Sequence, residues 1–171
     1  MTPQQLVLIR HAKAADGPTD IERPLAPRGR RDAGALGRLL ARAGIELDRV
    51  VVSPALRARQ TWDGAQAQLS ALVEVVVDQR IYDNEVDALF ELTRDTPPRV
   101  HTLGLVGHNP SFAELAHLLD HTRGDAEARQ ELRAGYPTTG VAVFDIVGSW
   151  AELGPHSATL RIFTVARDAG E

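Results

Sequence analysis

The stretch that decides the fold is Leu6-Val7-Leu8-Ile9-Arg10-His11-Ala12-Lys13. Four consecutive apolar residues are typical of a short buried strand, and a cation and an imidazole follow directly where that strand should end. In proteins built on parallel sheets, ligands bind at the carboxyl ends of the strands. The octapeptide therefore predicts a buried strand of an α/β protein that carries reactive side chains at its end.

The same arrangement occurs twice more along the chain. The apolar residues 103–107 run into His108, and residues 50–52 run into Ser53 and Pro54. We expect Ser53 to cap a helix whose first residue is Pro54, because a serine hydroxyl can accept an unpaired backbone N–H and proline has none to satisfy. All three strand ends should share one edge of the sheet.

The helix after Pro54 would also deliver a cation to that edge, since Arg57 lies about one turn into it. Arg10, His11, Arg57 and His108 would then surround one crevice. Guanidinium groups and helix N-termini attract anions, and an imidazole among them is an available nucleophile. This constellation predicts phosphoryl chemistry.

These motifs resemble those of the histidine phosphatase superfamily, and within it those of the short bacterial phosphohistidine phosphatases. Arg10-His11 is similar to the signature Arg-His pair of that family. Residues 53–61 resemble its Ser-Pro-x-x-Arg-Ala-x-x-Thr helix start, and residues 107–110 resemble the turn that carries its second histidine. Arg23-Pro24-Leu25 and Arg28-Gly29 also resemble the short subgroup, so the likeness spans most of the chain in order.

The resemblance implies a fold and a mechanism. The fold would be a three-layer αβα sandwich with a mainly parallel sheet, phosphoglycerate mutase-like, in a single domain over residues 1–171. Unprotonated His11 would attack phosphorus and form a transient phosphohistidine that water hydrolyses, with no metal and no cofactor. Arg10, Arg57 and His108 would bind the phosphoryl oxygens. We expect the crowded arginines also to disfavour protonation of His11.

The general acid is left open by the sequence. In the family a carboxylate often follows the third strand, and Asp83 and Glu85 occupy that region here. An N-cap role for Asp83 or Asn84, together with a favourable interaction of Glu85 with the helix dipole in the first turn, is an equal alternative. An oxygen leaving group needs a proton more urgently than the ring nitrogen of phosphohistidine, so a site with a poor acid favours P–N substrates.

Two further residues are candidates for substrate binding. Lys13 could take the place of polar residues that larger members carry after the Arg-His pair, although a surface lysine is the ordinary alternative. Asn109 follows His108 in the second-histidine turn. The residues that choose the substrate should lie in loops around 14–22, 80–87 and 134–139.

A metal site is the competing interpretation for other histidines. His117 and His121 stand four residues apart, which is ligand spacing on a helix. The glutamate of a His-Glu-x-x-His protease is missing, so we favour ordinary histidines at a helix end.

The hydrophobic pattern predicts alternating strands and helices. Strands are expected near residues 5–10, 49–53, 73–77, 100–106, 140–147 and 158–165. Helices are expected near residues 28–43, 54–69, 86–94, from 110 onward, and 126–134. The last two strands are expected to include an antiparallel one.

Composition narrows the partners. The chain has 171 residues and no cysteine, so thiol catalysis is excluded, and 19 basic against 23 acidic residues give a formal charge of −4 with no basic run suited to nucleic acid. No apolar stretch approaches the roughly 20 residues of a membrane span, and the start lacks a basic secretion signal. We expect a cytoplasmic monomer that acts on a phosphorylated protein or a small phosphorylated substrate. The alternatives are a small-molecule phosphomonoesterase or mutase of the same fold, and a non-catalytic phosphoanion-binding module.

Overall fold

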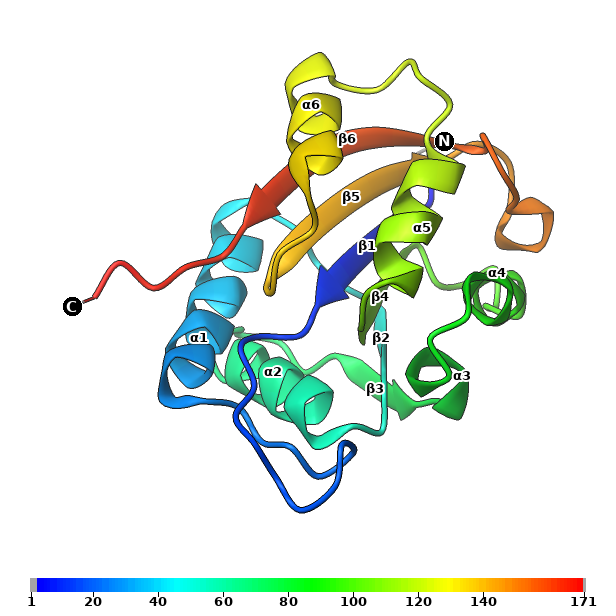
Figure 1. Ribbon diagram of the computed structural model, residues 1–171. Coiled ribbons are helices and arrows are strands. Elements are labelled where there is room, and N and C mark those ends of the chain that lie inside the picture. Colours follow the sequence, from blue (N-terminus) through cyan, green and yellow to red (C-terminus); the bar gives the residue numbers. More distant parts are fainter. Residues whose placement is uncertain (1–2, 171) are drawn as a thin grey trace.

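The computed structural model describes residues 3–170, and its centre is a six-stranded sheet in the order β3-β2-β4-β1-β5-β6 (Figure 1). The strands are β1 (Gln5–Arg10), β2 (Arg49–Val52), β3 (Glu74–Val77), β4 (Thr102–Gly107), β5 (Gly140–Ile146) and β6 (Ala158–Val165). The helices are α1 (Pro27–Arg42), α2 (Leu56–Gln66), α3 (Gln79–Tyr82), α4 (Val86–Arg94), α5 (Ser111–Leu119) and α6 (Ala126–Ala134), with a short 3₁₀ helix η1 (Trp150–Glu152). The alternation of strands and helices predicted from the sequence is confirmed, whereas α3 and η1 were not predicted.

The strand directions agree with a mainly parallel sheet. The pairs β3–β2, β2–β4 and β4–β1 are parallel, and β5 runs antiparallel to both β1 and β6. The antiparallel part is therefore confined to one side of the sheet, as expected for the last two strands. Because the four parallel strands share one direction, their carboxyl ends lie at the same edge.

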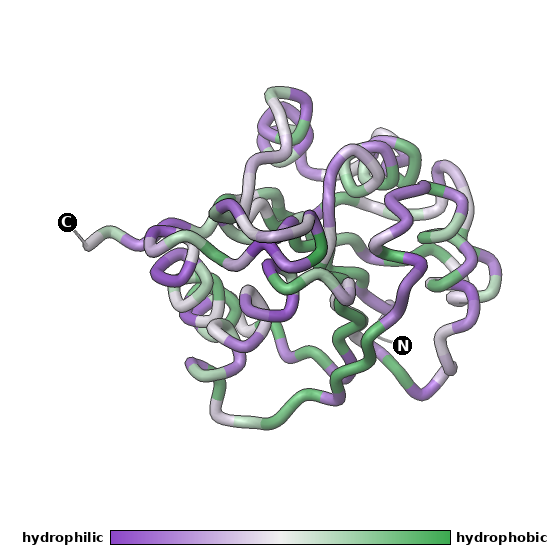
Figure 2. Tube along the Cα trace, turned by 60° about the horizontal axis from the view of Figure 1, so that its bottom comes forward, coloured by the Kyte–Doolittle hydropathy of each residue, from purple (hydrophilic) through white to green (hydrophobic). Residues whose placement is uncertain are grey.

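The first strand explains why the protein has three layers. Leu6 and Leu8 pack into one hydrophobic cluster, and Val7 and Ile9 pack into a second, because successive strand side chains point to opposite faces. All four side chains are fully buried. Helices α1 and α2 cover one face, while α4, α5 and α6 cover the other (Figure 1). Figure 2 shows stretches of hydrophobic colour in the middle of the molecule. The predicted αβα sandwich is confirmed.

The ends of the two helices on the first face differ in how well the sequence predicts them. Helix α1 ends at Arg42, one residue before the expected end, and Gly44 follows with a φ of 68° that suits glycine, while Ile45 N–H donates to the Leu40 carbonyl at 3.0 Å. Helix α2 begins at Leu56, not at Pro54, and Ala55 holds the cap position without a side-chain bond. The predicted cap role of Ser53 is wrong, because Pro54 and Ala55 form a bend before the helix, and the Ser53 hydroxyl accepts from Ala55 N–H at 3.2 Å, ahead of the first helical residue.

Candidate active site

Three strand ends meet where the sequence places its reactive residues. Arg10, the last residue of β1, pairs with Gly107, the last residue of β4, and His11 N–H donates to the Gly107 carbonyl at 2.9 Å. The next residue of each strand is therefore a histidine at the same edge. The ring centroids of His11 and His108 lie 5.2 Å apart. The sequence prediction that the two imidazoles share one edge is confirmed.

The tautomer of His11 leaves one nitrogen free for nucleophilic attack. Its Nδ1 lies 2.7 Å from the carbonyl oxygen of Ala12, which can only accept a hydrogen bond, so Nδ1 carries the proton. The lone pair is then on Nε2. The side chain is buried but faces the pocket, with 9% of the residue exposed. This geometry suits attack on a group bound in the pocket.

Burial keeps both imidazoles uncharged. The pKa of His11 is lowered from 6.5 to about 4, chiefly by burial, with the charges of Arg57 and Arg10 contributing to the decrease and the Ala12 carbonyl opposing it. Burial also lowers the pKa of His108 to about 3, with His11 and Arg57 adding to the effect. The expectation that arginines disfavour protonation of His11 has the right sign, although loss of solvent is the larger cause.

Two polar side chains hold the second histidine and its turn in place. His108 Nε2 lies 2.7 Å from the Ser53 hydroxyl, which also accepts from Ala55 N–H at 3.2 Å. Asn84 donates to the Asn109 carbonyl at 2.8 Å, and its side-chain oxygen accepts from Ser111 N–H at 3.1 Å. Asn84 thus brackets the turn that follows His108.

One main-chain oxygen links two side chains of the pocket, those of Arg10 and Asn109. The carbonyl of Tyr136 accepts a hydrogen bond from Arg10 at 2.9 Å and another from Asn109 at 2.9 Å. The Tyr136 hydroxyl is buried and donates to the Leu8 carbonyl at 2.6 Å. The segment before β5 therefore fixes two pocket residues.

Helix α2 is tied to the segment that follows β1. The hydroxyl of Thr61 accepts a hydrogen bond from Ala12 N–H at 2.9 Å and donates to the Arg57 carbonyl at 2.6 Å. Helix α1 also approaches closely at Gly29, where a side-chain carbon would overlap the carbonyl oxygen of Lys13. These contacts give a physical reason for the threonine and glycine of the sequence motifs.

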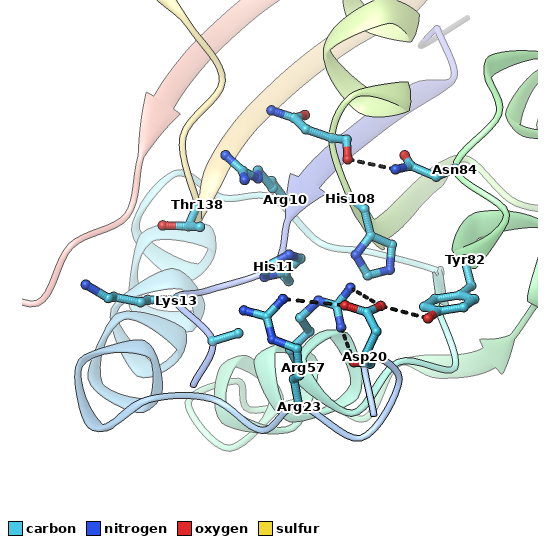
Figure 3. Close-up of a pocket in the computed structure, with 12 residues that line it drawn as sticks. Arg10, His11, Lys13, Asp20, Arg23, Arg57, Tyr82, Asn84, His108 and Thr138 are labelled. Carbon is cyan, nitrogen blue, oxygen red and sulfur yellow. Dashed lines mark hydrogen bonds and ion pairs between the residues drawn. The ribbon is translucent and has the colours of Figure 1, made fainter. Parts of the chain in front are cut away.

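Arg57 is buried and already engaged by the loop before α1. Its guanidinium donates to the Asp20 carbonyl at 2.7 Å and to the Asp20 carboxylate at 3.2 Å. Tyr82 donates its hydroxyl proton to the same carboxylate at 2.7 Å (Figure 3). The Tyr82 hydrogen bond, followed by that of Arg57, holds the pKa of Asp20 below its usual range, against the raising effect of desolvation.

These groups enclose a pocket of about 490 Å³. The pocket contains every predicted phosphate-binding and nucleophilic residue, but neither of the predicted acids. Its lining residues are Arg10, His11, Lys13, Ala14, Asp20, Arg23, Arg57, Tyr82, Asn84, His108, Asn109 and Thr138. Lys13 and Asn109, candidates from the sequence, thus lie beside the other four, and all three predicted substrate loops contribute.

The structure does not bring Asp83 and Glu85 to the pocket. Both are exposed. Asp83 follows the last residue of α3 and its carboxylate accepts from Gln79 at 3.2 Å, and Glu85 holds the position before α4. The side chains between and before them, Asn84 and Tyr82, line the pocket instead. The sequence prediction did not include Asp20, because its position in a loop gives no signal. It included Arg23 only as part of a family motif, with no role in the site.

The competing metal interpretation gains no support. His121 Nε2 lies 2.7 Å from the Thr159 hydroxyl, and His117 lies in the last turn of α5. Over residues 3–170 no group of three potential ligands could hold a metal ion. Over the same residues no helix is long and apolar enough to cross a membrane.

The charges of the pocket define what it can bind. Arg10, Lys13, Arg23 and Arg57 contribute cations, and Asp20 contributes the carboxylate among the lining residues. Such a surplus attracts an anion, and the planar guanidinium groups match phosphate oxygens. With the neutral His11 ring beside them, the pocket can bind a phosphoryl group and receive it on Nε2.

Comparison with known proteins agrees with this geometry. The sequence profile of the Histidine phosphatase superfamily (branch 1) matches residues 6–104. An uncharacterized protein of Mycobacterium tuberculosis is 38% identical over 162 residues, which cover 93% of this chain and all of the relative. The structure of a protein proposed to be the phosphohistidine phosphatase SixA of Nakamurella multipartitia is 30% identical, with a TM-score of 0.84 over 97% of this chain and 98% of that one. A protein given the same proposed identity in Agrobacterium tumefaciens is 27% identical, with a TM-score of 0.79 over 96% and 99% of the two chains. The strand ends, the paired histidines and the matched profile agree in placing this chain in the histidine phosphatase superfamily.

Proposed function

We propose that this protein is a metal-independent phosphatase that removes phosphoryl groups from phosphohistidine in proteins through a phospho-His11 intermediate. The observation that carries the proposal is the state of His11. Its Nδ1 proton is committed to the Ala12 carbonyl, so a neutral ring presents Nε2 to a pocket lined by cations. That arrangement supports nucleophilic attack on phosphorus.

In this mechanism the arginines and the second histidine neutralise the transferring group. Arg10 and Arg57 would bind its oxygens, and His108 would donate to it from the ring nitrogen that does not contact Ser53. Nδ1 of His108 is buried and has no hydrogen-bond partner among residues 3–170. An unpaired buried nitrogen of this kind costs stability unless a bound group satisfies it. Water would then hydrolyse phospho-His11.

The choice of a P–N bond rests on the carboxylates among residues 3–170, of which Asp20 alone lines the pocket. Its carboxylate lining comes from Asp20, whose contacts keep it ionised, and Asp83 and Glu85 lie outside. An alkoxide leaving group would have no carboxylic acid to protonate it, whereas an imidazole leaves without that help. The two solved structures proposed to be SixA phosphohistidine phosphatases support the same substrate class.

The proposed reaction is tested by following phosphate release from a phosphohistidine-bearing protein and from an aryl phosphate, with a chelator present throughout. Wild type should release phosphate from phosphohistidine faster than from the ester, and His11→Ala should release none from either. His101→Ala is the matched control, because that histidine is exposed and lies outside the pocket.

The outcome distinguishes the alternatives. A faster reaction with the ester would instead indicate a small-molecule phosphomonoesterase. Binding of inorganic phosphate without turnover of either substrate would indicate a non-catalytic module. Activity that survives in His11→Ala would refute the assignment of His11 as the nucleophile.

A further inference from the structure

Asp20 is the one feature of the pocket that a simple anion site does not explain, because a carboxylate repels phosphate. It comes from the loop between β1 and α1 and lies beside Tyr82, on the side of His11 away from Lys13 (Figure 3). Its side chain is 56% exposed, so it can meet a bound substrate. A residue in this place either hinders binding or serves a substrate that carries positive charge.

The contacts of Asp20 leave it able to accept another hydrogen bond. Oδ2 already accepts from Arg57 and Tyr82, while Oδ1 has a single contact, with Arg23 at 3.5 Å. A carboxylate offers about four acceptor positions in all. Oδ1 can therefore take a shorter hydrogen bond from a donor on the substrate.

The groups around Asp20 keep it ionised near neutral pH. Arg57 and Tyr82 face it from α2 and α3, Arg23 faces it from its own loop, and His108 faces it from the turn after β4. The hydrogen bonds from Tyr82 and Arg57 hold the pKa of the carboxyl below its usual range, and His108 is uncharged. Asp20 is thus an acceptor and a negative charge, and it has no proton to donate.

An ionised carboxylate affects the two kinds of leaving group in opposite ways. The oxygen of a phosphate ester leaves as an anion, which a nearby negative charge destabilises. The ring of phosphohistidine has a second nitrogen, and when that nitrogen is protonated the ring carries positive charge. A carboxylate that accepts a hydrogen bond from the ring stabilises this protonated form.

We propose that Asp20 accepts a hydrogen bond from the protonated imidazole ring of the phosphohistidine substrate and thereby makes the pocket selective for P–N over P–O bonds. The inference rests on the proposed function, and it assigns Asp20 as the residue that determines specificity. In the transfer step, Nε2 of His11 forms a bond to phosphorus as the P–N bond of the substrate breaks. The electron pair of that bond goes to the leaving nitrogen, and the ring departs as neutral imidazole with its other proton retained.

The enzyme ring undergoes the matching change. His11 keeps the Nδ1 proton that it donates to Ala12, so phospho-His11 is itself a protonated phosphoimidazole. The phosphoryl group therefore moves between two imidazoles in the same protonation state, and no external acid or base takes part in this step. Water then attacks phosphorus, the electron pair of the second P–N bond returns to Nε2 of His11, and both protons of the water leave with the phosphate product.

The test compares wild type with Asp20→Asn on a synthetic phosphohistidine peptide and on an aryl phosphate, both at neutral pH. Loss of a charged acceptor should lower kcat/KM for the peptide about tenfold or more. For the aryl phosphate the same variant should be faster than wild type, because the repelling charge is gone and Arg57 loses its ion pair while it keeps its hydrogen bond to the main-chain carbonyl of residue 20. Asp16→Asn, an exposed residue of the same loop outside the pocket, is the control for net charge.

The pH profile supplies a readout that a purely structural role would not move. The alkaline limb of kcat for the peptide should reflect deprotonation of the bound substrate ring, and it should shift to lower pH in Asp20→Asn. An ester rate that falls more than the peptide rate would make Asp20 a general acid and overturn the inference. Equal losses on both substrates would also overturn it while leaving the proposed function intact. A wild-type protein that releases no phosphate from the peptide would instead overturn the proposed function.

Discussion

Replacing Thr61 with valine tests whether helix α2 positions the nucleophile. Thr61 is fully buried, and its hydroxyl accepts from the backbone N–H of Ala12, the residue after His11. Valine has nearly the same shape but leaves that N–H buried without a partner, at a cost of about 2 kcal/mol. In a chain of this size the melting temperature should fall by about 4–8 °C. The backbone beside His11 should also relax, and kcat should fall about tenfold.

Thr93→Val is the matched control. Thr93 is also fully buried in a helix, but its hydroxyl only donates, to the carbonyls of Leu89 and Phe90 in its own helix. Its loss leaves no buried N–H without a partner. Urea unfolding and steady-state kinetics of both variants separate the two effects. The reasoning is refuted if Thr61→Val costs no more stability than Thr93→Val, or if it keeps the full kcat.

Two further predictions concern the histidines. Because the pKa of His11 is lowered from 6.5 to about 4 in the folded chain, the unfolded chain binds a proton first. The free energy of unfolding therefore has its full contribution from neutral His11 above pH 6.5. It decreases as the pH falls toward 4, by about 2 kcal/mol at pH 5. Urea unfolding at pH 7 and 5 should show a smaller loss for His11→Asn, and equal losses would contradict the shift. Asn84→Gly retains the positive φ of 61° but removes both hydrogen bonds to the turn after His108. The KM for an aryl phosphate should then rise about tenfold, and an unchanged KM would show that Asn84 does not support this turn.

The parts of the site that follow from the sequence are those placed by strand ends. An apolar run such as residues 6–9 defines both a buried strand and the position of the next side chain, so the sequence alone locates Arg10, His11 and His108. The parallel sheet then brings them together. Arg57 followed from a helix start that was placed two residues too early, an error too small to move it from the pocket.

The loop contributions could not be predicted because they depend on contacts between distant segments. Asp20 meets Arg57 across 37 positions and Tyr82 across 62, and no local pattern specifies such pairs. The role of Asn84 could not be predicted either. Its neighbours Asp83 and Glu85 carry more reactive groups, yet it is Asn84 that lines the pocket. Helix α3, only four residues long, gives too little periodicity to detect, yet it decides which of these side chains faces inward.

The shared carbonyl of Tyr136 has a consequence for how this protein tolerates change. Because the acceptor for both Arg10 and Asn109 is a main-chain oxygen, every substitution at position 136 retains it. Alanine scanning would therefore report only the loss of the aromatic ring and its hydroxyl. The junction that the Tyr136 carbonyl makes between Arg10 and Asn109 would go undetected. Chemical synthesis that replaces the carbonyl oxygen of Tyr136 with sulfur, a weaker acceptor, would leave Pro137 intact and test the junction directly. A substitution at position 136 thus changes the side chain but keeps the main-chain oxygen that holds Arg10 and Asn109.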